Sequence, residues 1–161
     1  MLLRTFILLI LFFVTHNLCG QIHIPTKKQL FKVFNASIKQ NSKSKISTNS
    51  NPWVICNDDS LYYKSDTLKL FPYSNKYPDC KCHCFIDWTF YKKNAFILTR
   101  EYTDEPRRVS VSHEDNWYVI KLSTKNDGLI LETYNQDLLI DQFQVIAIDE
   151  VIILKRLKIK L

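Results

Sequence analysis

From Trp53 onward, hydrophobic and polar residues alternate with a period of two, which is typical of β-strands that bury one face. The alternation is clearest over residues 82–91, where one face carries Cys82, Cys84, Ile86, Trp88 and Phe90. The same pattern predicts further short strands at 53–56, 61–64, 67–71, 95–102, 108–112, 117–124, 129–134, 138–148 and 151–157.

Short polar turns separate these segments, and the pair Asp127-Gly128 is a strong hairpin signal. Consecutive strands joined by such turns are antiparallel, because parallel pairs need long crossovers. Eight or more strands do not lie comfortably in one open sheet. We therefore predict a mainly β fold, in which an antiparallel up-and-down meander forms a small barrel, closed or incomplete, with one N-terminal helix.

That helix is predicted over residues 26–39. Thr26 is a suitable N-cap, Gln29 completes a capping box, and Leu30 and Phe34 recur at helical spacing. The residues that follow, 40–51, are polar and rich in Asn, Ser and Lys, so we expect a linker there.

Residues 1–20 have the three-part pattern of a secretory signal. Arg4 precedes an apolar run at 6–14, and the small Gly20 stands at the cleavage position. The run is shorter than the roughly 20 apolar residues that span a bilayer. A retained N-terminal helix and a lipid anchor through Cys19 are the less favoured alternatives. We therefore predict a secreted or periplasmic protein with a signal peptide at 1–20, the helix and linker at 21–51 and a β domain at 52–161.

Composition narrows the function classes. Of the 161 residues, 46% are hydrophobic and 24% are charged, which is ordinary for one globular domain and excludes a disordered chain. Two glycines cannot supply a glycine-rich phosphate loop. The net charge is +6, but the basic residues are spread along the sequence, so we expect no nucleic-acid partner. The sequence after residue 20 has no long apolar run, so we do not expect an integral membrane protein.

Four cysteines follow the signal segment: Cys56, Cys80, Cys82 and Cys84. An even number in an exported chain predicts disulfides, and four cysteines allow three pairings. Cysteines two residues apart on a strand are about 6.6 Å apart, near the upper limit for a bridge. We therefore expect at least one bridge from Cys56 to the cluster, closing a loop of roughly 25 residues and contributing about 3 kcal/mol.

The competing interpretation of this cluster is a metal site, since three cysteines and His83 lie within five residues. Structural zinc sites usually have gaps of two or more residues between paired cysteines, and His83 would point away from the sulfurs on a strand. We therefore predict no metal here. A redox thiol pair is also disfavoured, because the sequence has no CxxC motif.

The layout of residues 53–157 resembles the lipocalin-like domains of small exported bacterial proteins. The residues that carry the resemblance are Trp53 at the first strand, Arg156 near the end, and Trp88-Thr89-Phe90 followed by a Lys-Lys-Asn turn. The resemblance implies a meander barrel in which Arg156 packs on Trp53 at the closed end.

An eight-stranded barrel is just wide enough to be filled by side chains or to hold one small ligand. The first hypothesis is therefore a barrel that binds a small apolar molecule against Trp88 and Phe90. The alternative is a non-enzymatic surface interaction or inhibitor protein, with a filled core and an exposed apolar patch. An unknown protein partner is compatible with both.

Catalysis is disfavoured, because the chain has neither a GxSxG nor an HExxH motif. Two of the histidines after the signal segment, His23 and His113, lie in predicted terminal or turn segments, and the third is His83. The acidic residues Glu101, Asp104 and Glu105 fall at a loop that suggests exposure rather than paired acid and base roles. We predict no catalytic residue and no cofactor.

Overall fold

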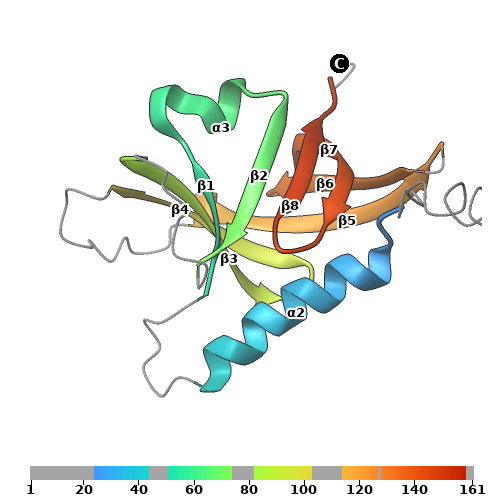
Figure 1. The fold of residues 1–161 in the computed structure, drawn as a ribbon, viewed down its shortest axis with the longest axis horizontal. Helices are drawn as coiled ribbons and strands as arrows, with labels where there is room; N and C mark the ends of the chain where they lie inside the picture. The colour runs from blue at the N-terminus through green and yellow to red at the C-terminus, as the bar shows by residue number, and fades with distance from the viewer. Residues whose placement is uncertain (1–23, 44–50, 74–81, 103–113, 127, 159–161) are drawn as a thin grey trace, which may run out of the picture.

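The computed structural model describes residues 24–43, 51–73, 82–102, 114–126 and 128–158 (Figure 1). Eight antiparallel strands form a closed barrel, as the alternating pattern predicted. The strands are β1 Trp53–Cys56, β2 Thr67–Pro72, β3 Cys84–Lys92, β4 Ala95–Tyr102, β5 Trp117–Lys125, β6 Gly128–Asn135, β7 Leu138–Ile148 and β8 Ile152–Arg156. The helices are α2 Lys27–Lys43 and α3 Leu61–Lys64, with 3-10 turns η1 Asp58–Ser60 and η2 Glu114–Asn116.

Strands β3 to β8 form a continuous meander, in which each strand pairs with the next. The barrel closes through β1 and β2: β1 lies between β2 and β3, and β2 pairs with β8. Register shifts in the β3–β4, β6–β7 and β7–β8 pairs supply bends that barrels often take from glycine. A chain with two glycines can therefore still close.

The predicted strand at 61–64 is wrong, because Leu61–Lys64 forms the short helix α3. A four-residue apolar pattern does not distinguish the two structures. The helical conformation is supported by Asn57, whose Oδ1 accepts a hydrogen bond from the N–H of Tyr62 at 3.1 Å. The predicted strand at 108–112 lies outside the described residues.

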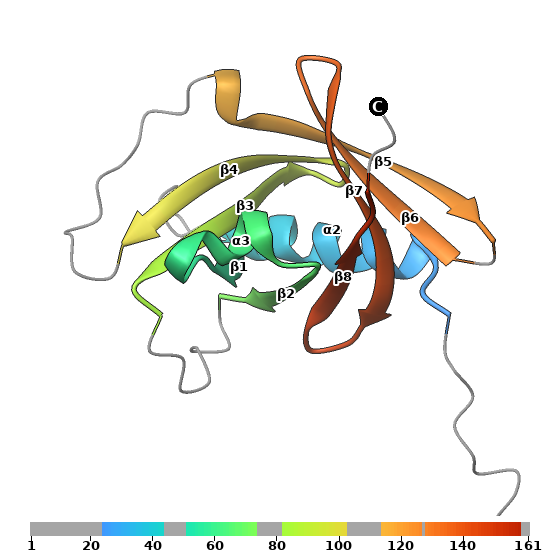
Figure 2. The same ribbon diagram turned by 90° about the horizontal axis from the view of Figure 1, so that it is seen from above.

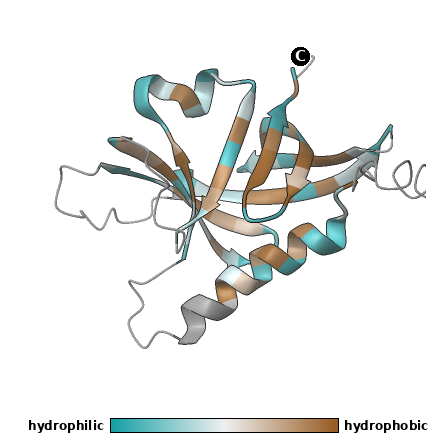
Figure 3. Cartoon of the chain, viewed as in Figure 1, coloured by the Kyte–Doolittle hydropathy of each residue, from teal (hydrophilic) through white to brown (hydrophobic). Residues whose placement is uncertain are grey.

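Helix α2 begins with the predicted capping box. The N–H of Thr26 donates to Oε1 of Gln29 at 2.9 Å, and the N–H of Gln29 donates to Oγ1 of Thr26 at 3.3 Å. The helix continues to Lys43, so residues 40–43 of the predicted linker are helical. Hydrophobic and hydrophilic bands alternate along it (Figure 3). Its buried residues include Leu30 and Phe34.

Helix α2 closes one end of the barrel, which we name the α2 end. Seen from above, it crosses the ring of strands (Figure 2). Leu30 and Phe34 belong to the same core cluster as the inward residues of the strands. The indole Nε1 of Trp53 donates to Oγ of Ser37 at 2.9 Å, which ties β1 to the helix. The opposite end, beside α3, is named the α3 end.

Candidate functional site

The barrel interior is filled by aromatic rings. Trp88 stacks on Phe96 with ring centroids 4.3 Å apart, and Phe96 stacks on Tyr118 at 5.3 Å. Phe90 is covered by Phe34 of α2, with centroids 4.0 Å apart. Trp88 and Phe90, the predicted ligand-lining residues, therefore both point inward and contact other side chains in the core.

Two pockets, of about 530 and 500 Å³, lie on the outside of the described part of the chain. Neither is lined by Trp88 or Phe90. One lies against α2 and the other lies beside the disulfide. These two pockets are therefore features of the surface and not of the barrel interior.

Arg156 closes the α3 end of the barrel. Its guanidinium lies 4.9 Å from the ring centroid of Phe143 and 5.8 Å from that of Tyr62. It forms an ion pair with Asp141, and its Nη2 donates to the carbonyl of Tyr62 at 2.6 Å. Burial raises the pKa of the Asp141 carboxyl, while Arg156 acts in the opposite direction.

The pair implied by the family resemblance is not formed. Trp53 lies at the α2 end, where it pairs with Pro72. Arg156 lies at the α3 end, where its N–H donates to the carbonyl of Asp66. These partners stand at opposite ends of β2, so the basic residue packs on Tyr62 and Phe143 instead of on Trp53.

The disulfide joins Cys56 to Cys82, with Cα atoms 5.9 Å apart. The predicted link between Cys56 and the cluster is therefore confirmed. Cys84 is a free, buried thiol, which corrects the prediction that it is bridged. Cys82 is already bonded to Cys56, and the Cys84 sulfur instead accepts a hydrogen bond from Nδ2 of Asn57 at 3.6 Å. Cys80 lies outside the described residues.

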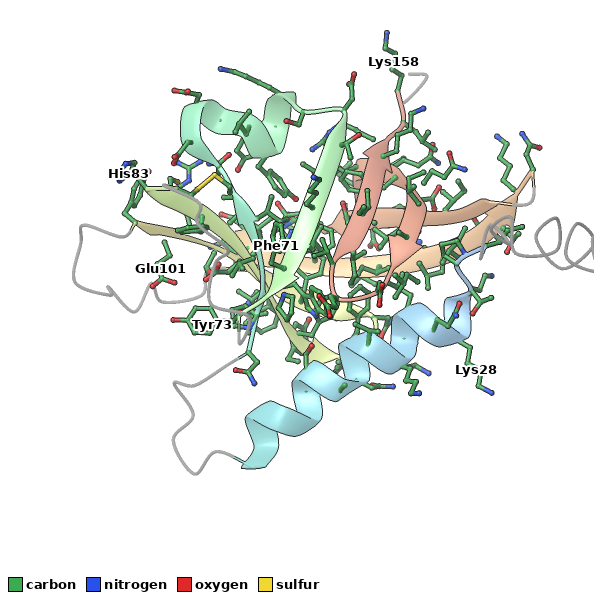
Figure 4. The ribbon with its side chains drawn as sticks, viewed as in Figure 1. Lys28, Phe71, Tyr73, His83, Glu101 and Lys158 are labelled. Carbon is green, nitrogen blue, oxygen red and sulfur yellow. A yellow bond between two sulfur atoms is a disulfide. The ribbon has the colours of Figure 1, made fainter. Side chains whose placement is uncertain are left out.

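Asp58 holds the start of β3 against η1. Its carboxylate accepts hydrogen bonds from the N–H of His83 at 3.0 Å and from the N–H of Cys84 at 2.8 Å. His83 itself lies near the disulfide at the α3 end of β3 (Figure 4). Asp59 and Ser60 both have positive φ, of 53° and 63°, a conformation that costs free energy in residues with a Cβ.

These residues border the smaller pocket, which also has Arg100 and Tyr102 from β4 in its wall. The sequence did not point to Asp58, Arg100 or Tyr102 as members of one site. Their proximity depends on the pairing of Cys84 with Tyr102 across β3 and β4, which the sequence does not show. Ligand atoms of Cys56, Asp58 and Cys82 lie within 4.8 Å of one another. In the disulfide state the two sulfurs are bonded to each other and are not thiolate ligands.

The larger pocket is a groove beside α2. It is lined by Lys28, Phe31, Lys32, Asn35 and Ala36 of the helix and by Lys93 of the turn between β3 and β4. The ammonium group of Lys93 lies 5.7 Å from the ring centroid of Phe31. The sequence alone did not reveal this basic cluster, because Lys93 lies about 60 positions after Lys28 and Lys32.

A third surface feature is an apolar patch on the outside of the barrel, which we name the outer apolar face. It consists of Tyr91, Ile97, Trp117, Val119 and Tyr134. Ile97 pairs with Trp117, and Val119 pairs with Tyr134, so these side chains continue across three strands. Trp117 is 47% exposed and Val119 is 41% exposed.

Two neighbouring carboxyl groups lie on β3 and β4: Asp87 is buried and Glu101 is half-buried. Asp87 is 6% exposed, and the carboxyl group of Glu101 lies close enough to interact with it electrostatically. Burial, followed by the charge of Glu101, raises the pKa of Asp87 to about 7. The other acidic and histidine candidates from the sequence, Asp104, Glu105, His23 and His113, lie outside the described residues.

Among the described residues, no helix is both long enough and apolar enough to cross a membrane. No protein-family model matches the chain, and neither the curated proteins nor the solved structures contain a significant match to it.

Proposed function

We propose that the chain is an exported, disulfide-stabilised, lipocalin-like barrel that acts as a non-enzymatic interaction protein through its outer apolar face. The observation that supports this most strongly is the contrast between the inside and the outside of the barrel. Inside, Trp88 and Phe90 are buried against other rings. Outside, the indole of Trp117 and the ring of Tyr91 lie beside each other, and both residues are at least 40% exposed.

The outer apolar face has the composition of a protein-binding hot spot. Trp117 and Tyr91 have ring centroids 5.9 Å apart, and both are at least 40% exposed. Tryptophan and tyrosine are enriched at such sites because they bury a large area at a small entropic cost. Lys121 lies at the border of the patch, with its ammonium 4.1 Å from the Tyr134 ring centroid. An apolar centre with a charged rim suits a protein partner.

A small apolar ligand inside the barrel is the second candidate, and the packing disfavours it. A ligand against Phe90 would have to displace Phe34, and a ligand against Trp88 would have to break its stack with Phe96. Each stacked pair contributes about 0.5–1.5 kcal/mol beyond the area it buries. A ligand would have to replace these contacts before it gained any affinity.

Photo-crosslinking tests the proposal. A benzophenone amino acid replaces Trp117 in one variant and Tyr63 in a matched control, because Tyr63 is a similarly exposed aromatic residue on α3. Each variant is irradiated in the exporting culture. We expect one defined protein adduct from position 117, no such adduct from position 63, and about tenfold less adduct when Val119→Lys is added.

Equal adducts from both positions, or an adduct that V119K leaves unchanged, would contradict the proposal. Native mass spectrometry of the exported protein supplies the second readout. A stoichiometric small apolar molecule that is lost in a Phe90→Trp variant would favour binding inside the barrel instead.

A further inference from the structure

We infer that the basic groove at the α2 end is a docking surface for the phosphate headgroups of an anionic lipid membrane. This goes beyond the proposed function, because the groove and the outer apolar face are different surfaces. The groove brings together Lys28 and Lys32 of α2 and Lys93 of the β3–β4 turn. All three lysines are exposed, and none of them comes from the outer apolar face.

The charge of this end supports an anionic partner. Helix α2 contains five lysines and no acidic residue over its 17 positions. Lys92 of β3 adds a further exposed positive charge next to Lys93. Within the part of the chain that the structure describes, the turn that leads into β8 places the exposed acids Asp149 and Glu150 at this end. Among the described residues, the exposed lysines therefore outnumber the exposed acids on this surface.

Apolar groups among the lysines favour a lipid surface over a dissolved anion. Phe31 is half-buried in the groove, and Ile24, just before the helix, is 52% exposed. Helices that lie on membranes combine lysines with such apolar residues, which enter the boundary between headgroups and acyl chains. A phosphate ion alone would gain nothing from them.

The side chains of the groove also have a suitable geometry. Lys28 and Lys32 are four residues apart and share one side of the helix. Lys93 approaches the same place from the barrel, with its ammonium over Phe31. A headgroup phosphate in the groove would thus meet ammonium groups from both sides, with the ring of Phe31 between them.

Vesicle co-sedimentation of the full exported chain tests this inference. We compare vesicles that contain phosphatidylglycerol with vesicles of phosphatidylcholine alone, at low and at high salt. The test variant is K28Q/K32Q/K93Q. The control variant is K69Q/K155Q/K158Q, which removes the same charge from exposed lysines of β2, β8 and the C-terminal segment. Lys158 and Lys28 lie at opposite ends of the molecule (Figure 4).

Each lysine near an anionic membrane strengthens binding about fivefold, so the test variant should lose about a hundredfold in partitioning onto the phosphatidylglycerol vesicles. The control should lose no more than about fivefold, because none of its three lysines lines the groove. Near-UV circular dichroism checks that both variants are folded. High salt should weaken the binding of the wild-type chain.

Equal losses in the two variants would overturn the inference, because net charge and not the groove would then decide binding. So would equal binding to the two kinds of vesicle. Binding to heparin that depends on Lys28, Lys32 and Lys93, with no vesicle binding, would assign the groove to an acidic polymer instead. An adduct from position 117 that persists in K28Q/K32Q/K93Q would leave the proposed function standing in either case.

Discussion

Phe34 of α2 lies face to face with Phe90 of β3, with ring centroids 4.0 Å apart. The pair joins α2 to strand β3, which begins 41 positions after the last residue of the helix. The two rings also seal the interior at the α2 end. Trp53 adds a second tie through its hydrogen bond to Ser37. The N-terminal helix is therefore part of the barrel core and not a separate appendage.

Truncating the helix side of this pair should destabilise the whole fold. Phe34→Ala should lower the free energy of unfolding by about 3–5 kcal/mol, because Phe34 is fully buried. The matched control is Phe31→Ala, which removes a half-buried ring from the same helix and should cost less than about 2 kcal/mol. Urea unfolding followed by tryptophan fluorescence measures both. Equal effects would mean that α2 does not plug the barrel.

The disulfide should contribute about 3 kcal/mol. Replacing both Cys56 and Cys82 by alanine removes a link across a sequence separation of 26 residues, and it should lower the free energy of unfolding by that amount. Cys84→Ala serves as the control, because its thiol is free in the structure. It should leave the Cys56–Cys82 peptide intact in non-reducing peptide mapping. A Cys84 disulfide peptide in the oxidised wild-type protein would contradict this pairing.

The ion pair of Arg156 with Asp141 should stabilise the α3 end of the barrel. Arg156→Ala leaves Asp141 partly buried without its cation, and it also removes a donor to the carbonyl of Tyr62, so we expect a loss of about 3 kcal/mol. Lys155→Ala, at an exposed neighbouring position, should change stability by less than about 0.5 kcal/mol. A double-mutant cycle with Asp141→Asn isolates the pairwise contribution. A coupling energy near zero would show that the ion pair contributes nothing to the free energy of unfolding.

The barrel could be predicted from the sequence because its main signal is local. Alternation over residues 82–91 follows from a strand with one buried face, and that strand is observed as Cys84–Lys92. The helix was equally accessible, since Thr26 and Gln29 form their capping box within the first turn. Each of these features depends on residues a few positions apart.

The features that the sequence could not reveal depend on contacts between distant segments. Arg156 packs on Tyr62 and not on Trp53, because β2 pairs with β8. This pairing places the helix α3, which precedes β2 in the sequence, next to Arg156. Lys93 reaches the groove of α2 only after the barrel has closed on the helix. The alternation pattern gave inward positions for Trp88 and Phe90, but it could not say whether other rings would fill the space between them.

Asp87 should make the stability of the protein depend on pH near neutrality. Burial and Glu101 raise its pKa from 3.8 to about 7 in the folded protein. Between about pH 4 and pH 7, Asp87 therefore keeps its proton in the folded state, whereas in the unfolded state it has released it. The contribution of Asp87 to stability is therefore fully present below about pH 4, and it is lost as the pH rises through about 7. The loss should be at most about 4 kcal/mol.

Asp87→Asn should abolish this dependence, because an amide does not titrate in this range. The measurement is the difference in unfolding free energy between wild type and D87N, followed by urea denaturation from pH 4 to pH 8. Asp149→Asn, at an exposed turn, is the control and should follow the wild-type profile. Glu101→Gln should keep part of the dependence, because burial is the larger cause of the shift and the charge of Glu101 the smaller one. A difference between wild type and D87N that stays constant from pH 4 to pH 8 would mean that Asp87 is ionised in the folded barrel throughout.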